Sequence, residues 1–283
     1  MNRVHTLLAA GFSLLLFSPT VVAQQSGKVN YRGATYIKIA PDKEAAMQDF
    51  LKGTSLKLIR EELNAHRFAS WAMLRITYSG VPAADYNYLQ AINYDGAPPA
   101  QLDPAARDAM YRKATGMSFV EYQQKLTTFG VVVGSVLSRI EAEVPGSQVS
   151  EGNYVQTIRW KITPQRGAEY GNYIQKMMQP LQAQALRDGR FLGWSATRTV
   201  YPGGGDAAYD ATTSFTYKDM AAALPTSAPS PDAGQMGFSK VFPGQNYTTF
   251  VDEGREIRRA VRTDLWRVVA AAGAGATVRT SSR

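Results

Sequence analysis

The sequence predicts a mixed α+β fold made of two tandem copies of one β-α-β-β-α-β unit. Residues 36–96 align without a gap onto residues 159–219 at a constant offset of 123 positions. Fifteen of the 61 aligned positions are identical, against roughly four expected from average composition. Strand-like and helix-like hydrophobic periods also follow one another in the same order in both copies. The clearest shared pattern, R-F-x-x-W-x-x-x-R-x-x-Y-x-G, comprises Arg67, Phe68, Trp71, Arg75, Tyr78 and Gly80, and then Arg190, Phe191, Trp194, Arg198, Tyr201 and Gly203.

Each copy begins with a strand and an amphipathic helix. The first strand covers Tyr36–Ala40 in one copy and about Tyr154–Thr163 in the other, and a proline follows each. The apolar positions of the helix then recur with a period near 3.6, which is typical of a helix that buries one face. These positions are Met47, Phe50, Leu51, Leu58 and Leu63 in the first copy, and Tyr170, Tyr173, Ile174, Leu181 and Leu186 in the second.

A hairpin follows in both copies. Its strands are rich in aromatic and β-branched residues, and its turns contain Gly and Pro. The predicted strands are Phe68–Tyr78 and Tyr86–Tyr94 in the first copy, and Phe191–Tyr201 and Tyr209–Tyr217 in the second.

The last helix and strand of each copy differ more. Ser118 with Glu121, and Thr249 with Asp252, have the capping-box layout that begins a helix. We expect the final strands at about Val131–Val144 and Val261–Ala271, an extra helix near Asp103–Ala114, and an exposed loop over Leu224–Gln245.

The N-terminus has the pattern of a secretory signal peptide. Arg3 precedes an apolar stretch from Leu7 to Phe17, and Val21-Val22-Ala23 fits a cleavage site. No later stretch approaches the ~20 apolar residues of a membrane-spanning helix. We therefore expect a periplasmic or secreted protein, divided into a signal peptide (1–23), a first repeat (34–145), a second repeat (152–272) and a flexible tail (273–283).

Composition excludes several kinds of chemistry. The chain has no cysteine, which removes disulfides, thiolate nucleophiles and cysteine metal sites. After loss of His5 with the signal peptide, His66 is the single histidine. We therefore expect no metal site, no cofactor and no histidine-based charge relay.

The mature chain would carry a net charge of +7, from 30 basic and 23 acidic residues. Because an exported protein meets anionic surfaces more readily than nucleic acid, we expect no nucleic-acid partner. Four arginines recur at i, i+3, i+4 and i+7, the spacing of one helix face. This predicted interaction face comprises Arg255, Arg258, Arg259 and Arg262.

A β-α-β-β-α-β unit is the ferredoxin-like pattern. In tandem, it resembles the dimeric α+β barrel superfamily, which includes NIPSNAP-like, EthD-like and antibiotic-biosynthesis-monooxygenase-like proteins. The resemblance rests on the element order and the repeat, and covers nearly all of residues 34–272. It implies a single-chain pseudo-dimeric barrel with the sheets packed face to face and the helices outside. It supplies no motif on which catalytic residues could be placed. Haem-binding relatives use a proximal His, whereas His66 ends the first helix opposite Gly189.

Strand alternation suggests a site between the sheets. Ile37 and Ile39 would lie under the helices, while Tyr36 and Arg159 would point the other way. Trp71 and Arg75, with their second-copy equivalents, would then share the space between the sheets. Arg binds carboxylates, and Trp offers a stacking surface. The predicted ligand-binding residues are Lys38, Trp71, Arg75, Lys161, Trp194 and Arg198.

Two functions follow from these features. The first is an exported protein that binds a small anionic or aromatic molecule between its sheets, with any catalysis independent of a cofactor. The second is a non-enzymatic envelope scaffold whose partners meet the basic helix face. The duplicated Trp and Arg residues fit a site, and they also fit a plain interface that holds the two halves together. The sequence leaves these alternatives, and the oligomeric state, open.

Overall fold

The computed structural model describes residues 29–80, 85–144, 149–203, 207–224 and 231–273. The predicted signal peptide (1–23) and the residues after Gly273 lie outside these ranges, so export and a flexible tail stay predictions. None of the helices within the described ranges combines the length and apolarity that crossing a membrane requires.

Both repeats have the predicted element order. In the first repeat, a short 3₁₀ turn and a π-helical turn flank α1, and every element is bounded as follows: β1 Tyr31–Ile39, η1 Pro41–Lys43, α1 Glu44–Phe50, η2 Leu51–Ser55, α2 Leu56–Asn64, β2 Ser70–Ser79, β3 Tyr88–Tyr94, α3 Pro104–Thr115, α4 Phe119–Thr127 and β4 Gly130–Val144.

The second repeat follows the same plan, and its π-helical turn occupies the equivalent place. Its elements are β5 Tyr154–Ile162, α5 Gly167–Asn172, η3 Tyr173–Met178, α6 Gln179–Arg187, β6 Gly193–Tyr201, β7 Ala211–Tyr217, α7 Met220–Ala223, α8 Pro231–Ser239, α9 Tyr247–Ile257 and β8 Arg258–Gly273.

The eight strands form one closed antiparallel barrel in the order β1-β3-β2-β8-β5-β7-β6-β4. Each repeat supplies four neighbouring strands, and the two sets join through the pairs β2–β8 and β4–β6. Both joints include long strands, since β4 has 15 residues and β8 has 16. The predicted pseudo-dimeric barrel is confirmed, and closure leaves the sheet without an open edge.

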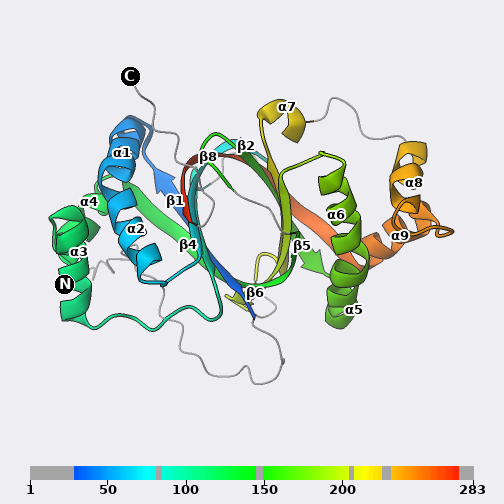
Figure 1. Ribbon diagram of the computed structural model, residues 1–283, viewed down its shortest axis with the longest axis horizontal. Helices are drawn as coiled ribbons and strands as arrows, with labels where there is room; N and C mark the ends of the chain where they lie inside the picture. The colour runs from blue at the N-terminus through cyan, green and yellow to red at the C-terminus, as the bar shows by residue number, and fades with distance from the viewer. Residues whose placement is uncertain (1–28, 81–84, 145–148, 204–206, 225–230, 274–283) are drawn as a thin grey trace, which may run out of the picture.

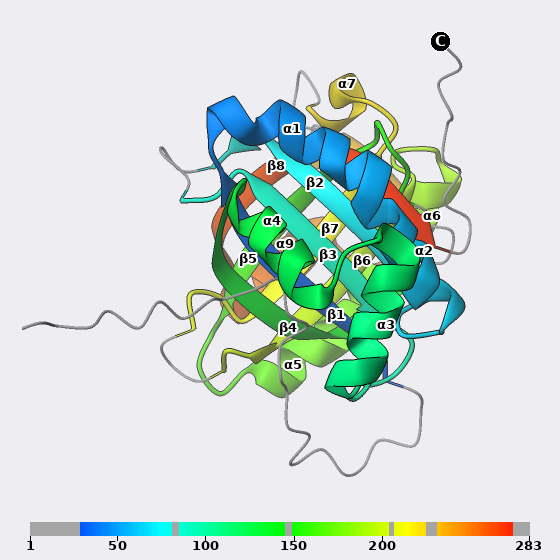
Figure 2. The same ribbon diagram turned by 90° about the vertical axis from the view of Figure 1, so that its left-hand side faces the viewer.

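Helices cover the barrel on two opposite sides. Figure 1 shows α1–α4 on one side and α5, α6, α8 and α9 on the other, with the barrel between them. Figure 2 shows the helices of the first repeat lying across its strands. Apolar clusters lie between each helical layer and the sheet, and a third cluster lies inside the barrel. The strands are therefore packed on both faces.

Two predictions about the late elements were wrong. Leu224–Gln245 is not simply an exposed loop, because it contains α8, and Phe238 of that helix is 1% exposed in the core. Both repeats thus insert an extra helix at the same point, α3 and α8. The capping box of Ser118 and Glu121 is confirmed, whereas α9 is capped by Asn246 and not by Thr249.

The basic helix face was also a wrong prediction. Helix α9 ends at Ile257, and Arg258 begins β8. Strand β8 pairs with β5, and Arg258 lies opposite Ile162. Only Arg255 lies on the helix, where it pairs with Asp252 at 3.1 Å. Arg258 is buried, and its guanidinium lies 4.0 Å from the ring centroid of Trp160. The residues from Arg258 onward form a strand because β8 pairs with β5, although their spacing predicted a helix. A helical spacing of residues predicts local structure only weakly when long-range pairing is possible.

Candidate functional site

The register of the sheet decides which side chains share a face. Residues directly opposite one another in an antiparallel pair point to the same side. Ile37 lies opposite Tyr88, and Tyr88 lies opposite Arg75. Because Ile37 packs under the helices, Arg75 lies on the helix side as well. The same holds in the second repeat, where Trp160 lies opposite Ala211 and Ala211 opposite Arg198.

The prediction that Trp71, Arg75, Trp194 and Arg198 project between the sheets is therefore wrong. Trp71 packs with Met47 and Leu51 of the first helical layer, and Trp194 packs with Tyr170 and Ile174 of the second. The prediction failed because it took the inner face to be polar, whereas Leu74, Trp266 and Val268 make that face a core too. Alternation cannot orient a strand that is apolar on both faces.

The four predicted cations do not meet. Arg75 pairs with Glu44 of α1 at 2.8 Å, and Lys38 is exposed. Lys161 donates to the backbone oxygen of Ala207 at 2.6 Å. Arg198 donates to the backbone oxygen of Gly167. Arg75, Lys161 and Arg198 are therefore each engaged with a different acceptor.

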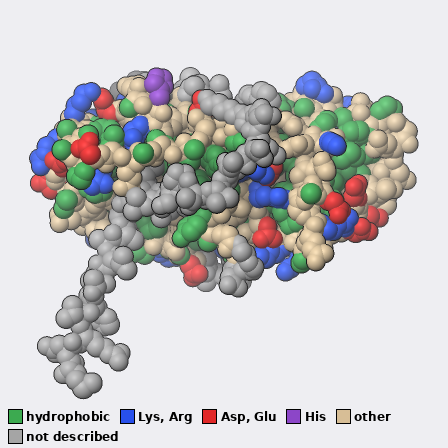
Figure 3. Space-filling view, turned by 90° about the horizontal axis from the view of Figure 1, so that it is seen from below, with side chains coloured by type: hydrophobic (Ala, Val, Ile, Leu, Met, Phe, Trp, Pro, Cys, Tyr) green, Lys and Arg blue, Asp and Glu red, His purple; other side chains and the backbone are tan. Residues whose placement is uncertain are grey.

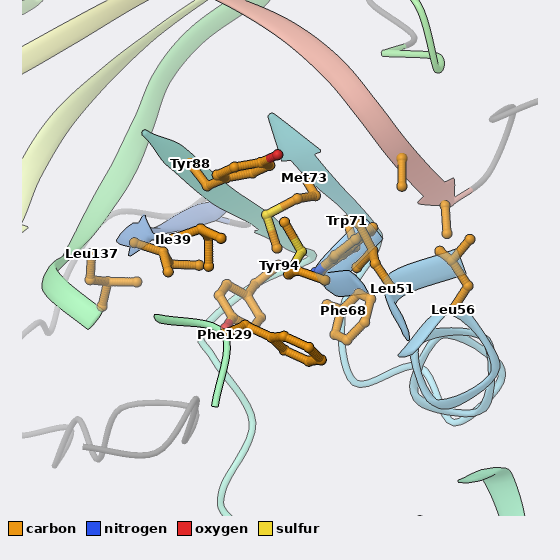
Figure 4. Close-up of a cluster of buried hydrophobic side chains, with 14 residues drawn as sticks. Ile39, Leu51, Leu56, Phe68, Trp71, Met73, Tyr88, Tyr94, Phe129 and Leu137 are labelled. Atoms are coloured by element: carbon orange, nitrogen blue, oxygen red, sulfur yellow. The ribbon is translucent and has the colours of Figure 1, made fainter. Parts of the chain in front are cut away.

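A large cavity lies between the sheet and the helices of the first repeat. Its volume is about 630 Å³, and its walls come from β1–β4, α1–α4 and the π-helical turn η2. In Figure 4, Trp71, Met73 and Tyr94 lie on the side of the strands that faces Leu51 and Phe68. We call this space the helix–sheet cavity. Its apolar lining includes Ile37, Ile39, Met47, Phe50, Leu51, Leu58, Ile59, Phe68, Trp71, Met73, Ile92 and Phe129.

A few polar groups interrupt this apolar wall. Trp71 is 3% exposed, and its indole Nε1–H has no hydrogen-bond partner among the described residues. The hydroxyl of Tyr122 donates to Ser55 Oγ at 2.7 Å. Glu62 accepts from Arg67 Nε at 2.8 Å. Most ligand sites have this composition, an apolar cavity with a few placed polar groups.

Buried ionisable groups around the cavity have shifted pKa values. Burial raises the pKa of Tyr122 to about 12, so its hydroxyl stays protonated at neutral pH. Burial also raises the pKa of Tyr94 and Tyr111. The pKa of Glu62 is raised by burial against the opposing effect of Arg67. The phenols are therefore neutral groups able to donate hydrogen bonds.

Arg107 adds a cation to the lining. Its guanidinium carbon lies 3.9 Å from the ring centroid of Phe119, and its buried Nε has no hydrogen-bond partner among the described residues. Two residues of the cavity lining, Trp71 and Arg107, thus each have a buried N–H without an acceptor among the described residues.

In the second repeat, larger side chains and an arginine occupy the equivalent space. Trp160 replaces Ile37, Tyr170 replaces Met47 and Met178 replaces Ser55. The guanidinium of Arg258 also enters this layer, 5.1 Å from the ring centroid of Tyr173. The two repeats therefore share a fold but differ in the space that they leave. The sequence indicates this difference, because Ser55 aligns with Met178, and the same offset extended along the first strand matches Gly33 and Thr35 with Gln156 and Ile158.

The barrel interior is occupied by a different set of duplicated residues. Tyr36 and Arg159 occupy equivalent positions, and both point inward as predicted. The Tyr36 and Tyr209 hydroxyls are 3.0 Å apart, and Arg159 donates to the Tyr86 hydroxyl at 2.6 Å. Arg159 also lies 3.3 Å from Asp264. This group joins the two repeats inside the barrel, while Trp71 and Trp194 lie on strands that pair with the other repeat, opposite Ala272 and Val144.

His66, the one histidine within the described ranges, does not contribute to either interior. His66 is exposed and has a φ of 53°, in the left-handed region where Gly189 ends the matching helix with a φ of 72°. Its role is that of a helix C-terminal residue. No histidine of the described residues lines the helix–sheet cavity, so none of them could ligate a haem there. Within the described residues, no group of three His, Cys, Asp or Glu could hold a metal ion.

Comparison with known proteins gives similarities of structure. No family model matches the chain, and neither does any curated protein. A candidate monooxygenase from Lactobacillus acidophilus NCFM has a TM-score of 0.51 at 9% identity, with 89% of this chain and 99% of that chain covered. A candidate monooxygenase from Fusobacterium nucleatum has a TM-score of 0.52 at 9% identity, with coverages of 88% and 97%.

These solved structures belong to the dimeric α+β barrel superfamily. At such identities, the likeness shows the fold alone. The chain is therefore a single-chain α+β barrel of two ferredoxin-like repeats, and its function has to be argued from its own cavities.

Proposed function

We propose that this protein binds a small, largely apolar aromatic molecule in the helix–sheet cavity of its first repeat. The observation that carries the proposal is an apolar cavity of about 630 Å³ whose lining includes Trp71, a buried residue whose indole N–H has no partner among the described residues. A buried N–H donor without an acceptor lowers the stability of the folded protein, and an oxygen atom of a ligand would accept its hydrogen bond. The ligand therefore carries a hydrogen-bond acceptor, and the aromatic side chains of the lining, such as Phe68, Trp71 and Phe129, favour an aromatic ring.

The sequence also predicts an aromatic ligand, but between the two sheets. We place this ligand between the sheet and the helices of the first repeat. The space between the sheets contains a smaller cavity of about 230 Å³, whereas the volume of the helix–sheet cavity lies within the range of about 300–1,000 Å³ typical of ligand sites. Two structural neighbours are named as candidate monooxygenases, which supports a small organic ligand. The scaffold alternative loses its support because the basic helix face does not exist as one surface.

A transplant between the repeats tests the proposal. We expect the double variant Gly33→Gln/Thr35→Ile, which copies Gln156 and Ile158, to fill the cavity and reduce the affinity for 2-acetylnaphthalene at least about tenfold. A β-carbon at Gly33 would meet Tyr94 at 3.4 Å, an ordinary contact, so the fold should tolerate the change. Titration calorimetry measures the affinity.

The matched control is Val131→Ile, which enlarges an apolar side chain on β4 that is 63% exposed. It should bind the probe as the parent protein does. Equal affinity of the double variant and the parent, with both folded, would place the ligand elsewhere and contradict the proposal.

A further inference from the structure

The barrel interior contains a second cavity, lined by strands of both repeats. Its volume is about 230 Å³. Strands of the first repeat supply small and apolar side chains such as Ala34, Ala72 and Leu89. Strands of the second repeat supply hydroxyl groups. These belong to Thr157, Ser195, Thr197, Thr212, Ser214 and Thr216. We call this space the barrel cavity.

Arg32 of β1 lines the barrel cavity, and its hydrogen bonds to described residues use only two of its five N–H groups. Its Nε donates to Asn93 Oδ1 at 2.7 Å, and its Nη1 donates to Ser195 Oγ at 2.9 Å. A guanidinium has five N–H donors. Among the described residues, the Nη2 group of Arg32 has no hydrogen-bond acceptor. The hydrogen bonds of Nε and Nη1 therefore orient the guanidinium, and its Nη2 group can donate to a ligand.

No described carboxylate neutralises Arg32 directly. Glu143, which also lines the cavity, is exposed and makes no ion pair with Arg32 within 4.0 Å. Burial lowers the pKa of Arg32, and the charge of Glu143 acts in the opposite direction. Deeper in the barrel, Asp264 is shared by Arg159 and Arg262 at 3.3 and 2.8 Å. The interior therefore has an excess of positive charge.

We propose that the barrel cavity binds a small organic carboxylate. The carboxylate would pair with the free end of the Arg32 fork, a geometry that suits bidentate recognition. Its carbon chain would pack on Ala34, Ala72 and Leu89. The negative charge that pairs with Arg32, and not the volume of the cavity, distinguishes this ligand from the largely apolar molecule of the helix–sheet cavity.

Butyrate and its uncharged isostere butyramide test this site. In ligand-observed NMR and calorimetry, the parent protein should bind butyrate and bind butyramide at least about tenfold more weakly, because charge-assisted hydrogen bonds are the stronger ones. The variant Arg32→Gln should weaken butyrate binding at least about tenfold. The control Arg112→Gln removes an exposed arginine of α3, paired with Asp108, and should change nothing. Prior saturation with 2-acetylnaphthalene should not displace butyrate.

Three results would overturn the inference. These are no butyrate binding by the parent, equal binding of the acid and the amide, and unchanged binding by folded Arg32→Gln. If that variant does not fold, a crystal of the parent soaked in butyrate decides the question. Butyrate on the Arg32 guanidinium would support the site, and water alone would reject it. Failure here leaves the aromatic site intact, because the two probes occupy different cavities.

Discussion

Trp71 is the residue whose chemistry separates a binding site from a plain core. Its indole ring packs as a core residue, but its N–H has no partner among the described residues. Trp194, the equivalent residue of the second repeat, has the same unpaired N–H in a layer occupied by larger side chains. The two tryptophans therefore form a matched pair, in which only one adjoins the helix–sheet cavity.

We expect Trp71→Phe to weaken binding of 2-acetylnaphthalene by roughly threefold to tenfold, since a neutral hydrogen bond contributes about 0.5–1.5 kcal/mol. Binding of 2-ethylnaphthalene, which lacks the acceptor, should not change. Trp194→Phe should alter neither affinity. Fluorescence titration of both probes measures the difference, and equal losses for the two probes would show that the indole N–H makes no bond to the ligand.

Residue patterns explain why the sequence predicted the fold well and the site poorly. The repeat and the hydrophobic periods of its strands and helices predicted the element order. The alternation of side chains along a strand also predicted correctly that Tyr36 and Arg159 point into the barrel. Trp71 and Arg75 were misplaced because β2 is buried on both faces near its start. Face assignment there depends on the pairing of Tyr88 with Arg75 and Ile37, a long-range contact that no local pattern contains.

At the scale of elements, α8 shows how composition can mislead. Leu224–Gln245 is rich in small and breaking residues, yet α8 places Phe238 in the second core, with its ring centroid 4.9 Å from that of Phe250. One buried aromatic side chain therefore fixes a segment that would otherwise be classed as loop. The sequence alone does not show this contact, because Phe250 and the rest of the second core are brought next to Phe238 only by the fold.

Phe238→Ala should lower the free energy of unfolding by about 3–5 kcal/mol, the usual effect of removing a buried Phe. Met236→Ala on the same helix is the control. Met236 is 66% exposed, so its replacement should change stability by no more than about 0.5 kcal/mol. Urea denaturation followed by circular dichroism measures both variants. Equal, small effects would mean that α8 does not pack on the core.

At the scale of the whole molecule, buried tyrosines couple the fold to pH. Burial raises the pKa of Tyr122 and of Tyr170 to about 12, and it raises the pKa of Tyr209 in the barrel interior well above its usual value. Above a pH of about 10, the usual pKa of tyrosine, the unfolded chain loses these protons while the folded protein keeps them. Stability is therefore complete below a pH of about 10 and falls as the pH rises towards 12.

Denaturation midpoints measured against pH, together with phenolate absorbance, test this coupling. Tyr122→Phe should lower stability at neutral pH, because the Ser55 hydrogen bond is lost, but should make the alkaline decline shallower. Replacing Tyr78, which is 60% exposed, should leave the pH profile unchanged. A Tyr122→Phe profile parallel to that of the parent would contradict the assignment.

The closed barrel also explains the charge distribution. Of the four arginines grouped by spacing, Arg258 and Arg262 have buried partners, and Arg255 pairs with Asp252 on the surface. On the face shown in Figure 3, basic and acidic side chains lie side by side over both halves of the molecule. The net positive charge is therefore an interior as well as a surface property, and this could not be read from spacing alone.

The central claim is that the first repeat, and not the second, binds an aromatic ligand between its sheet and its helices. Methionine-methyl NMR tests it directly, because Met47 and Met73 line the helix–sheet cavity and Met178 lies in the equivalent layer of the second repeat. On titration with 2-acetylnaphthalene, the Met47 and Met73 signals should shift while Met178 stays unchanged. Shifts confined to Met178, or no shifts at saturating ligand, would contradict the claim.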